Sequence, residues 1–316
     1  MSAELHRTDA DARGARRILC KQIDEAVAAL DGKRVADSKI HEARKAIKKA
    51  RATLRLMRDA IPATSYKREN AALRDAARPL SAIRDARVLI DTLDRLEQLY
   101  GPAAKQSIPA GFRRDLVRAQ DEIRESVTGA RGALPGSVKA LLAARRRVMR
   151  LRVTAAGWRD IGKGLKRVYR KGRNAMKQAR KTPTAECLHE WRKQTKYLWH
   201  QLQTLEPMWP GPIGELADQT HKLSDYLGDD HDLVVLRENV MAHPKSFTGP
   251  GGSGALLALI DRCQKQLREK AFLAGGRIYD EKPAAFEGRA GRYWRRWQNE
   301  KAEYAPRRPA ARVRVH

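Results

Sequence analysis

Two short segments of the sequence carry closely spaced basic side chains behind a histidine. The first is HEARKAIKKARATLRLMR at residues 41–58, and the second is HEWRKQTKYLWHQ at residues 189–201. Both begin with the pattern His-x-x-Arg-Lys-x-x-Lys, and in both a glutamate directly follows the histidine. Guanidinium groups bind phosphate oxygens in bidentate geometry and ammonium groups add mobile point charges. The pattern is therefore typical of an anion-binding surface.

The basic residues of each segment fall on one side of a helix at about 100° per residue, opposite an apolar stripe suited to a core. Between residues 41 and 58, seven Lys/Arg are balanced only by Glu42. Solvated helix faces normally mix signs at i,i+4 spacing, because like charges there repel. We therefore expect two anion-binding faces. The first basic face comprises His41, Arg44, Lys45, Lys48, Lys49, Arg51 and Arg55, and the second basic face comprises His189, Arg192, Lys193 and Lys196.

Two further basic groups stand outside these faces. Lys166, Arg170 and Arg173 recur at helical spacing ahead of the second segment, and we expect them to contribute to anion binding. The run from Arg145 to Arg150 is the densest basic cluster of the chain. It suits either a phosphate contact zone or a solvated helix end whose arginines favour the helix dipole.

The histidine at the start of each face could either contact the ligand or donate a hydrogen bond to a neighbouring group. Cations flank His41 and His189, so the pKa of each imidazole should be lowered in the free protein and raised by a bound polyanion. The alternative is a neutral imidazole that donates to a neighbouring group. Their equivalent positions in the two segments favour ligand contact.

Catalytic chemistry has little support in the sequence. Asp229, Asp230, His231 and Asp232 could form a metal site, but the corresponding stretch 82–85 reads Ala-Ile-Arg-Asp and lacks the ligands. We instead expect Asp85 and Asp232 to have a structural role, in which they pair with the basic faces or with a helix terminus and orient those side chains. The three cysteines show no zinc-binding spacing. The sequence thus predicts a protein that is not an enzyme and that uses no metal or cofactor.

Composition narrows the class of partner. The 316 residues include 65 Lys+Arg against 37 Asp+Glu, a formal net charge of +28. Such an excess points to nucleic acid, an anionic membrane surface or a phosphate polymer. Aromatic residues make up 6% of the chain, which disfavours base-stacking platforms for single strands. The chain has no apolar run long enough to span a membrane and no secretory signal, so we expect a cytoplasmic protein.

An internal repeat organises the chain. Almost no stretch alternates with period two, which predicts an all-α fold. His41 and His189 lie 148 residues apart, and Asp85 and Asp232 lie 147 apart. We therefore expect two pseudo-symmetric four-helix bundles, 1–156 and 157–300, with a basic central groove or channel between them and a disordered basic tail at 301–316. We also expect Ser38 to cap the second helix and Pro79 to bend or break the third.

At these residues the sequence resembles the CHAD family, the conserved histidine α-helical domain. The match lies in both His-containing segments, in the paired IRDARVL and DDHDLVVL stretches, and in the ending IYDEKPAAFEGRAGRYWRRW. The second segment departs from the pattern at Tyr197 and Trp199, which predicts weaker binding by the second basic face. The resemblance implies binding of inorganic polyphosphate in a basic channel and association with polyphosphate granules. With no Glu-x-Glu-x-Lys motif, the chain resembles a stand-alone member without its own hydrolase. A general nucleic-acid or nucleoid-associated protein is the alternative.

Overall fold

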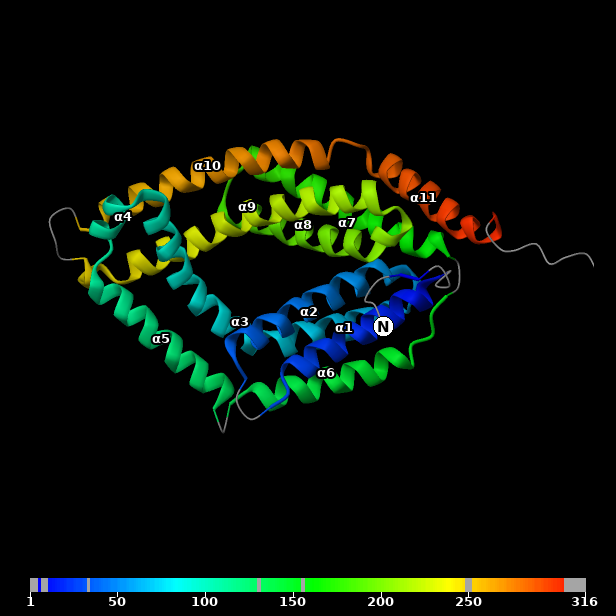
Figure 1. Ribbon diagram of the computed structural model, residues 1–316, viewed down its shortest axis with the longest axis horizontal. Helices are drawn as coiled ribbons and strands as arrows, with labels where there is room; N and C mark the ends of the chain where they lie inside the picture. Colours follow the sequence, from blue (N-terminus) through cyan, green and yellow to red (C-terminus); the bar gives the residue numbers. More distant parts are fainter. Residues whose placement is uncertain are drawn as a thin grey trace, which may run out of the picture.

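The computed structural model describes residues 5–6, 11–32, 35–129, 132–154, 157–247 and 252–303. Within these ranges every regular element is helical, so the predicted all-α class is confirmed (Figure 1). The helices of the first half are α1 (Ala12–Ala29), α2 (Asp37–Leu56), η1 (Arg58–Ala60), α3 (Ala63–Tyr100), α4 (Pro102–Ser107), α5 (Ala110–Thr128) and α6 (Leu134–Met149).

The second half repeats the order of a helix pair followed by a long helix. Its helices are α7 (Trp158–Lys181), α8 (Ala185–Leu205), η2 (Glu206–Met208), α9 (Pro210–Ala242), η3 (Pro244–Ser246), α10 (Gly254–Ile278) and α11 (Pro283–Glu303). The helix α11 runs past the expected boundary at residue 300, and the predicted tail beyond residue 303 lies outside the described residues. None of the helices in the described ranges combines the length and the apolar composition that a bilayer span requires.

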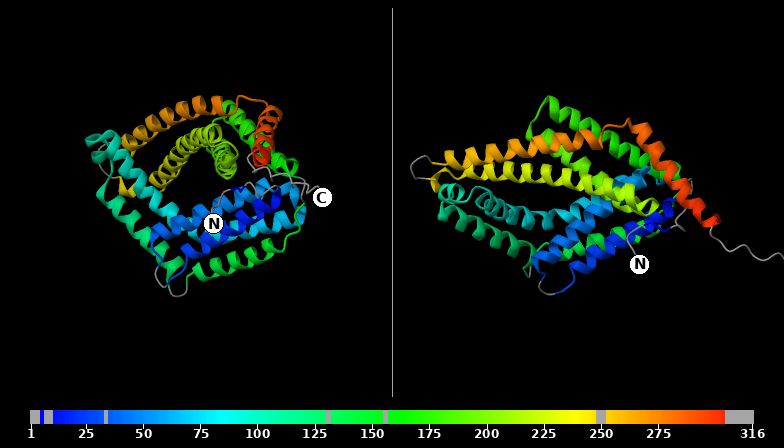
Figure 2. Two further views of the ribbon diagram at one scale, coloured as in Figure 1. Left: turned by 45° about the vertical axis from the view of Figure 1, so that its right-hand side comes forward. Right: turned by 45° about the horizontal axis from the view of Figure 1, so that its top comes forward.

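Three apolar cores hold these helices together. Figures 1 and 2 show how the helices are arranged. The first joins α1, α2 and α6 with the first part of α3. The second joins α7, α8 and α11 with the first part of α9 and the end of α10, and it also includes Ile18, Ala52 and Leu56 of the first half. The third lies at the far end, where the last turns of α3 and α9 meet α4, α5 and the start of α10. Leu93 of α3 and Leu236 of α9 are both fully buried there. This third core joins segments of both halves, which the sequence pattern did not predict.

Two expected helix features differ in detail from the structure. Helix α2 begins at Asp37 with Ala36 as its cap residue, so Ser38 lies within the first turn and does not cap it. Asp37 takes the first position instead, where a carboxylate suits the positive end of the helix dipole. Helix α3 runs through Pro79 without a break, so of the two expected alternatives the break is absent. The flanking residues Ala76 and Leu80 are buried, and their packing maintains the helical path.

A close approach of α7 fixes the end of α2. A methyl group on Gly164 would overlap the carbonyl oxygen of Leu56, so only glycine allows the two helices to touch here. We expect Gly164→Ala to lower the free energy of unfolding by about 1–3 kcal/mol through overpacking. Urea unfolding measures this loss. Gly276→Ala on α10 is the control, because a methyl group there meets nothing within 4 Å and should be neutral or stabilising.

Candidate functional site

Helices α2 and α8, which carry the two basic faces, pack against each other at the centre of the molecule (Figure 1). The Gln201 side chain of α8 donates a hydrogen bond of 3.2 Å to the carbonyl oxygen of Ala52 in α2. Helix α3 lies beside α2, and α9 lies beside α8. The structure therefore brings residues of both basic faces into one region, with α3 and α9 as its neighbours.

Arg44 and Arg192 occupy equivalent positions on the two helices. Arg44 is buried, and its Nη2 lies 3.6 Å from Oδ1 of Asp85 on α3. Burial lowers the pKa of both guanidinium groups; Asp85 opposes the shift at Arg44, and Asp232 opposes it most at Arg192. Among the described residues, neither Nε has a hydrogen-bond partner. The expected structural role of Asp85 is thus confirmed, because Asp85 forms an ion pair with Arg44. The negative charge of Asp232 acts on Arg192 in the corresponding way.

Lys48 and Lys196 lie next to these arginines. Burial and the charges of Arg44 and Arg192 lower the pKa of Lys48 to about 8. Burial, Arg192 and Lys48 lower the pKa of Lys196 to about 6. Lys48 nevertheless keeps an exposed side chain. The Lys48 side chain is thus crowded by surrounding atoms and still contacts solvent, as a side chain on a concave surface does. We call Arg44, Lys48, Arg192 and Lys196 the cationic centre.

The end of the second segment differs from the corresponding part of the first. Trp199 stacks on His200 with ring centroids 4.5 Å apart, and it meets the His221 ring in a tilted contact at 3.8 Å. His200 is buried, and its pKa falls to about 3 because burial disfavours the charged ring. The charge of Lys49 adds to this shift. Trp199 corresponds to Arg51 of the first segment, so an aromatic contact replaces a cation at this position.

His41 and His189 are exposed at the start of their helices, and Lys45 is exposed beside His41. The predicted lowering of the pKa is confirmed for both imidazoles, with partial burial of the ring as the larger cause. Arg84 of α3 is the next contributor at His41, and His231 of α9 is the next at His189. The His189 and His231 rings meet edge-on at 4.7 Å. Both imidazoles thus favour the neutral form in the free protein.

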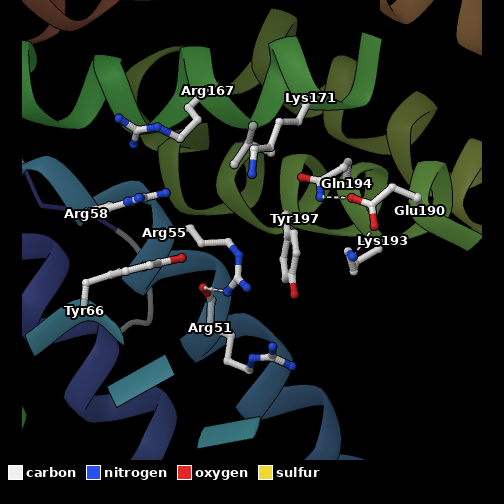
Figure 3. A pocket seen from close by; sticks show the side chains of 11 residues that line it. Arg51, Arg55, Arg58, Tyr66, Arg167, Lys171, Glu190, Lys193, Gln194 and Tyr197 are labelled. Atoms are coloured by element: carbon white, nitrogen blue, oxygen red, sulfur yellow. Dashed lines mark hydrogen bonds and ion pairs between the residues drawn. The ribbon is translucent and has the colours of Figure 1, made fainter. Parts of the chain in front are cut away.

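A basic cavity of 240 Å³ lies where the end of α2 meets α7 and α8 (Figure 3). The Arg55 guanidinium covers the Tyr197 ring at 3.9 Å, and that of Arg58 covers the Tyr66 ring at 4.8 Å. Tyr197, one of the departures from the expected pattern, therefore supports an arginine. The cavity is lined by Arg51, Arg55, Arg58, Tyr66, Arg167, Val168, Lys171, Glu190, Lys193, Gln194 and Tyr197.

Two of the cations in this cavity have carboxylate partners. Arg167 donates two hydrogen bonds of 2.7 Å to Asp59, and this pair holds the pKa of Asp59 below its ordinary value. Lys193 forms an ion pair with Glu190, which also accepts a hydrogen bond of 2.7 Å from Gln194. These contacts position the walls and leave the other cations available for a ligand.

The three expected α7 residues are not brought into this cavity. Arg173 donates a hydrogen bond of 2.9 Å to the carbonyl oxygen of Tyr279, which caps α10. Lys166 shares that side of α7 with Tyr169, which stacks on Phe286 of α11 at 4.0 Å. Arg170 is exposed and does not line the cavity either.

Arg167 and Lys171 take their place from the adjacent side of α7. Sequence reasoning missed them. Gly164 could have indicated them, because a glycine inside a helix often marks a site where another backbone packs closely. Residues three, four and seven positions after it lie on the same side of the helix.

Two arginines of the α6 cluster join α6 to α1 and α3. Arg145 donates to both carboxylate oxygens of Asp24 on α1, at 2.6 and 3.0 Å. Arg147 binds the buried carboxylate of Glu69 on α3, with its shortest contact at 2.8 Å. For these two arginines the structure favours a stabilising role over a phosphate contact zone.

The acidic residues of α9 are also engaged. Asp229 accepts a hydrogen bond of 2.5 Å from Arg95 of α3. Asp230 is buried and accepts one of 2.7 Å from Arg268 of α10. No group of three or more His, Cys, Asp or Glu residues in the described ranges is placed to hold a metal ion. The two aspartates instead tie α9 to its neighbours.

In its described residues the protein is all-helical, and cations of α2 and α8 gather where these two helices meet. The chain belongs to the CHAD domain family, whose model matches residues 17–240. PptA from Streptomyces chartreusis has a similar structure, with a TM-score of 0.57, 13% identity, and coverage of 86% of this chain and 100% of that one. The CHAD domain from the plant Ricinus communis is similar too, with a TM-score of 0.52, 16% identity, and coverage of 92% and 93%. No curated protein sequence matches the chain.

Proposed function

We propose that this protein binds inorganic polyphosphate without hydrolysing it, through the cationic centre and the basic residues beside it. The observation that carries the proposal is the desolvated state of the cationic centre. Burial lowers the pKa of all four cations there, and the charge of Arg192 lowers the pKa values of Arg44, Lys48 and Lys196 further. The Nε atoms of Arg44 and Arg192 lack partners among the described residues. A buried donor without a partner costs about 1–3 kcal/mol. Phosphate oxygens would satisfy these donors and relieve the repulsion.

The spacing of the basic side chains along α2 suits a linear chain of phosphates. Residues at i, i+3, i+4 and i+7 recur about every 5–6 Å along one face. Arg44, Lys48, Arg51 and Arg55 follow this spacing on α2, so one helix can contact several consecutive phosphates. The exposed yet crowded Lys48 supports a concave, groove-like surface. A polymer with closely spaced charges and little else to recognise suits such a surface.

Binding without hydrolysis is favoured by where the carboxylates lie. Hydrolysis of phosphoanhydrides usually needs a metal ion that is held by several carboxylates. Here Arg44 holds Asp85, Arg95 holds Asp229, and Arg268 holds Asp230. These acids orient basic side chains and neighbouring helices. Association with polyphosphate granules in the cytoplasm would be the cellular consequence, and co-localisation of a fluorescent fusion with stained granules would test it.

A competition titration tests the function. Labelled polyphosphate is bound at about 150 mM salt, where exposed charges more than about 8 Å apart are largely screened. It is then displaced by unlabelled polyphosphate or by duplex DNA at equal phosphate concentration. We expect polyphosphate alone to displace the label efficiently. Equal displacement by DNA would show a general polyanion surface and favour a nucleic-acid-binding protein.

A further inference from the structure

The first basic face leads into the cavity at the end of α2. From Arg44 the face continues through Lys48 to Arg51 and Arg55, and the last two residues line the cavity. Arg58, on the short helix η1 that follows, also lines it (Figure 3). A chain of phosphates that follows α2 toward its C-terminal end therefore arrives in this cavity.

Helix α7 closes the path at that point. Gly164 of α7 packs directly on the backbone of Leu56, the last residue of α2. Val168 and Lys171, four and seven residues further along α7, form the facing wall of the cavity. The basic face thus ends against a helix, and the cavity lies at its end.

The cavity has more positive charge than its own carboxylates balance. Among the described residues, no carboxylate forms an ion pair with any of four lining cations. These cations are Arg51, Arg55, Arg58 and Lys171. A terminal phosphate carries a charge of about −1.5 to −2 near pH 7, because its second pKa is near 6. Interior units of a linear polyphosphate carry one charge each. The cavity therefore suits a terminal group better than an interior unit.

Size and aromatic contacts narrow the ligand further. At 240 Å³ the cavity is smaller than the range of about 300–1,000 Å³ typical for drug-sized ligands. Arginines cover one face of each tyrosine ring, Arg55 on Tyr197 and Arg58 on Tyr66. The rings support guanidinium groups, so base stacking is not their role here. A compact inorganic phosphate group fits this lining better than a nucleotide.

We propose that this cavity is a chain-end site, which binds the terminal phosphates of a polyphosphate chain whose remainder lies along the basic faces. The proposal rests on the proposed function, since it specifies which part of the polymer is held at this cavity. A free short oligophosphate presents the same terminal chemistry. The two sources are separated by the experiment below.

The experiment compares long-chain polyphosphate with free ends and the same polymer with its terminal phosphates converted to alkyl phosphoramidates. Capping the ends hardly changes the total charge of a long chain, so binding through the basic faces alone would be unaffected. For the wild-type protein we expect capping to lower the affinity about tenfold or more, because charge-assisted contacts to the terminus are lost.

Variants locate the effect in the cavity. The double variant Lys171→Ala, Arg58→Ala should bind free-ended polymer about as weakly as the wild type binds capped polymer, and capping should have no further effect. Lys177→Ala on the same helix is the control, because Lys177 is exposed and does not line the cavity. It should retain the full difference between free and capped polymer.

Inorganic tripolyphosphate completes the design. We expect it to bind the wild type and to lose affinity in the double variant. If capped and free polymer bind the wild type equally well, the chain-end site is wrong while polyphosphate binding stands. Tight tripolyphosphate binding in that case would assign the cavity to free oligophosphates and would equally overturn the chain-end site. If the wild type binds no long polymer in either form, the proposed function itself fails.

Discussion

A protein with Arg44→Gln and Lys48→Glu should bind polyphosphate at least about a hundredfold more weakly than the wild type. Both residues belong to the cationic centre, and a contact to a charged group is worth about 1.5–3 kcal/mol. Two lost contacts thus correspond to about two orders of magnitude or more. Glutamine is chosen at position 44 because Asp85 lies 3.6 Å from the Arg44 guanidinium. A glutamate there would repel it and risk unfolding the helix pair.

The control for this variant is Arg292→Gln, Arg296→Glu on α11. Both arginines are exposed and stand four residues apart, as Arg44 and Lys48 do, so the two variants differ from the wild type by the same charge. Fluorescence titration at fixed salt should show only a few-fold loss for this control. A similar loss in both variants would mean that net charge drives binding. Matching thermal unfolding curves would show that the folds are intact.

Much of the site could be predicted because helix periodicity is a local property. The positions of Arg44 and Lys48 on one face of α2 follow from spacing alone, and so do those of Arg192 and Lys196 on α8. A structural role for Asp85 beside the basic face was also expected, and its ion pair with Arg44 bears this out. These inferences need only a helix and a neighbouring acidic helix.

The direction in which α7 faces could not be predicted in the same way. Spacing places Lys166, Arg170 and Arg173 on one side of the helix, but it does not say which side meets α2. That choice depends on the contact of Gly164 with α2 and on the stack of Tyr169 with α11. Both are long-range contacts, and they direct Arg167 and Lys171 into the cavity instead.

The third core is a second long-range feature. It pairs the last turns of α3 with those of α9, which lie about one repeat apart in the sequence. The sequence of each helix shows one continuous apolar stripe. Nothing in this pattern marks the residue at which the stripe stops packing in one core and begins to pack in the next. Arg95 and Asp229 illustrate this, since their 2.5 Å contact joins α3 to α9 next to this core. The internal repeat and the division at residue 156 stay predictions.

Polyphosphate affinity should fall as the pH rises from about 6 to about 8, with Lys196 as the main cause. Its pKa is about 6 in the free protein, so it is largely neutral at pH 7. A bound polyanion favours the charged ammonium and raises that pKa, so binding takes up a proton in this pH range. One proton taken up corresponds to an affinity change of up to about tenfold per pH unit. Below pH 6 Lys196 is already charged, and this contribution levels off.

The groups around Lys196 support the sign of this prediction. Arg192 of its own helix and Lys48 of α2 oppose its charge, whereas Asp232 and Asp225 of α9 favour it too weakly to restore an ordinary pKa. The Lys48 pKa of about 8 adds a dependence of the same sign above pH 8. His41 and His189, whose pKa values lie below the ordinary imidazole value, act in the same direction at lower pH.

Titrations at several pH values with Lys196→Gln isolate this residue. The variant should bind more weakly at pH 6 and show a much flatter profile between pH 6 and 7.5, because the titrating ammonium is gone. Lys193→Gln, on the same helix but paired with Glu190, should keep the wild-type slope. A flat wild-type profile would contradict the role of Lys196. An unchanged slope in Lys196→Gln would place the proton uptake on other groups, with the two histidines as the next to replace.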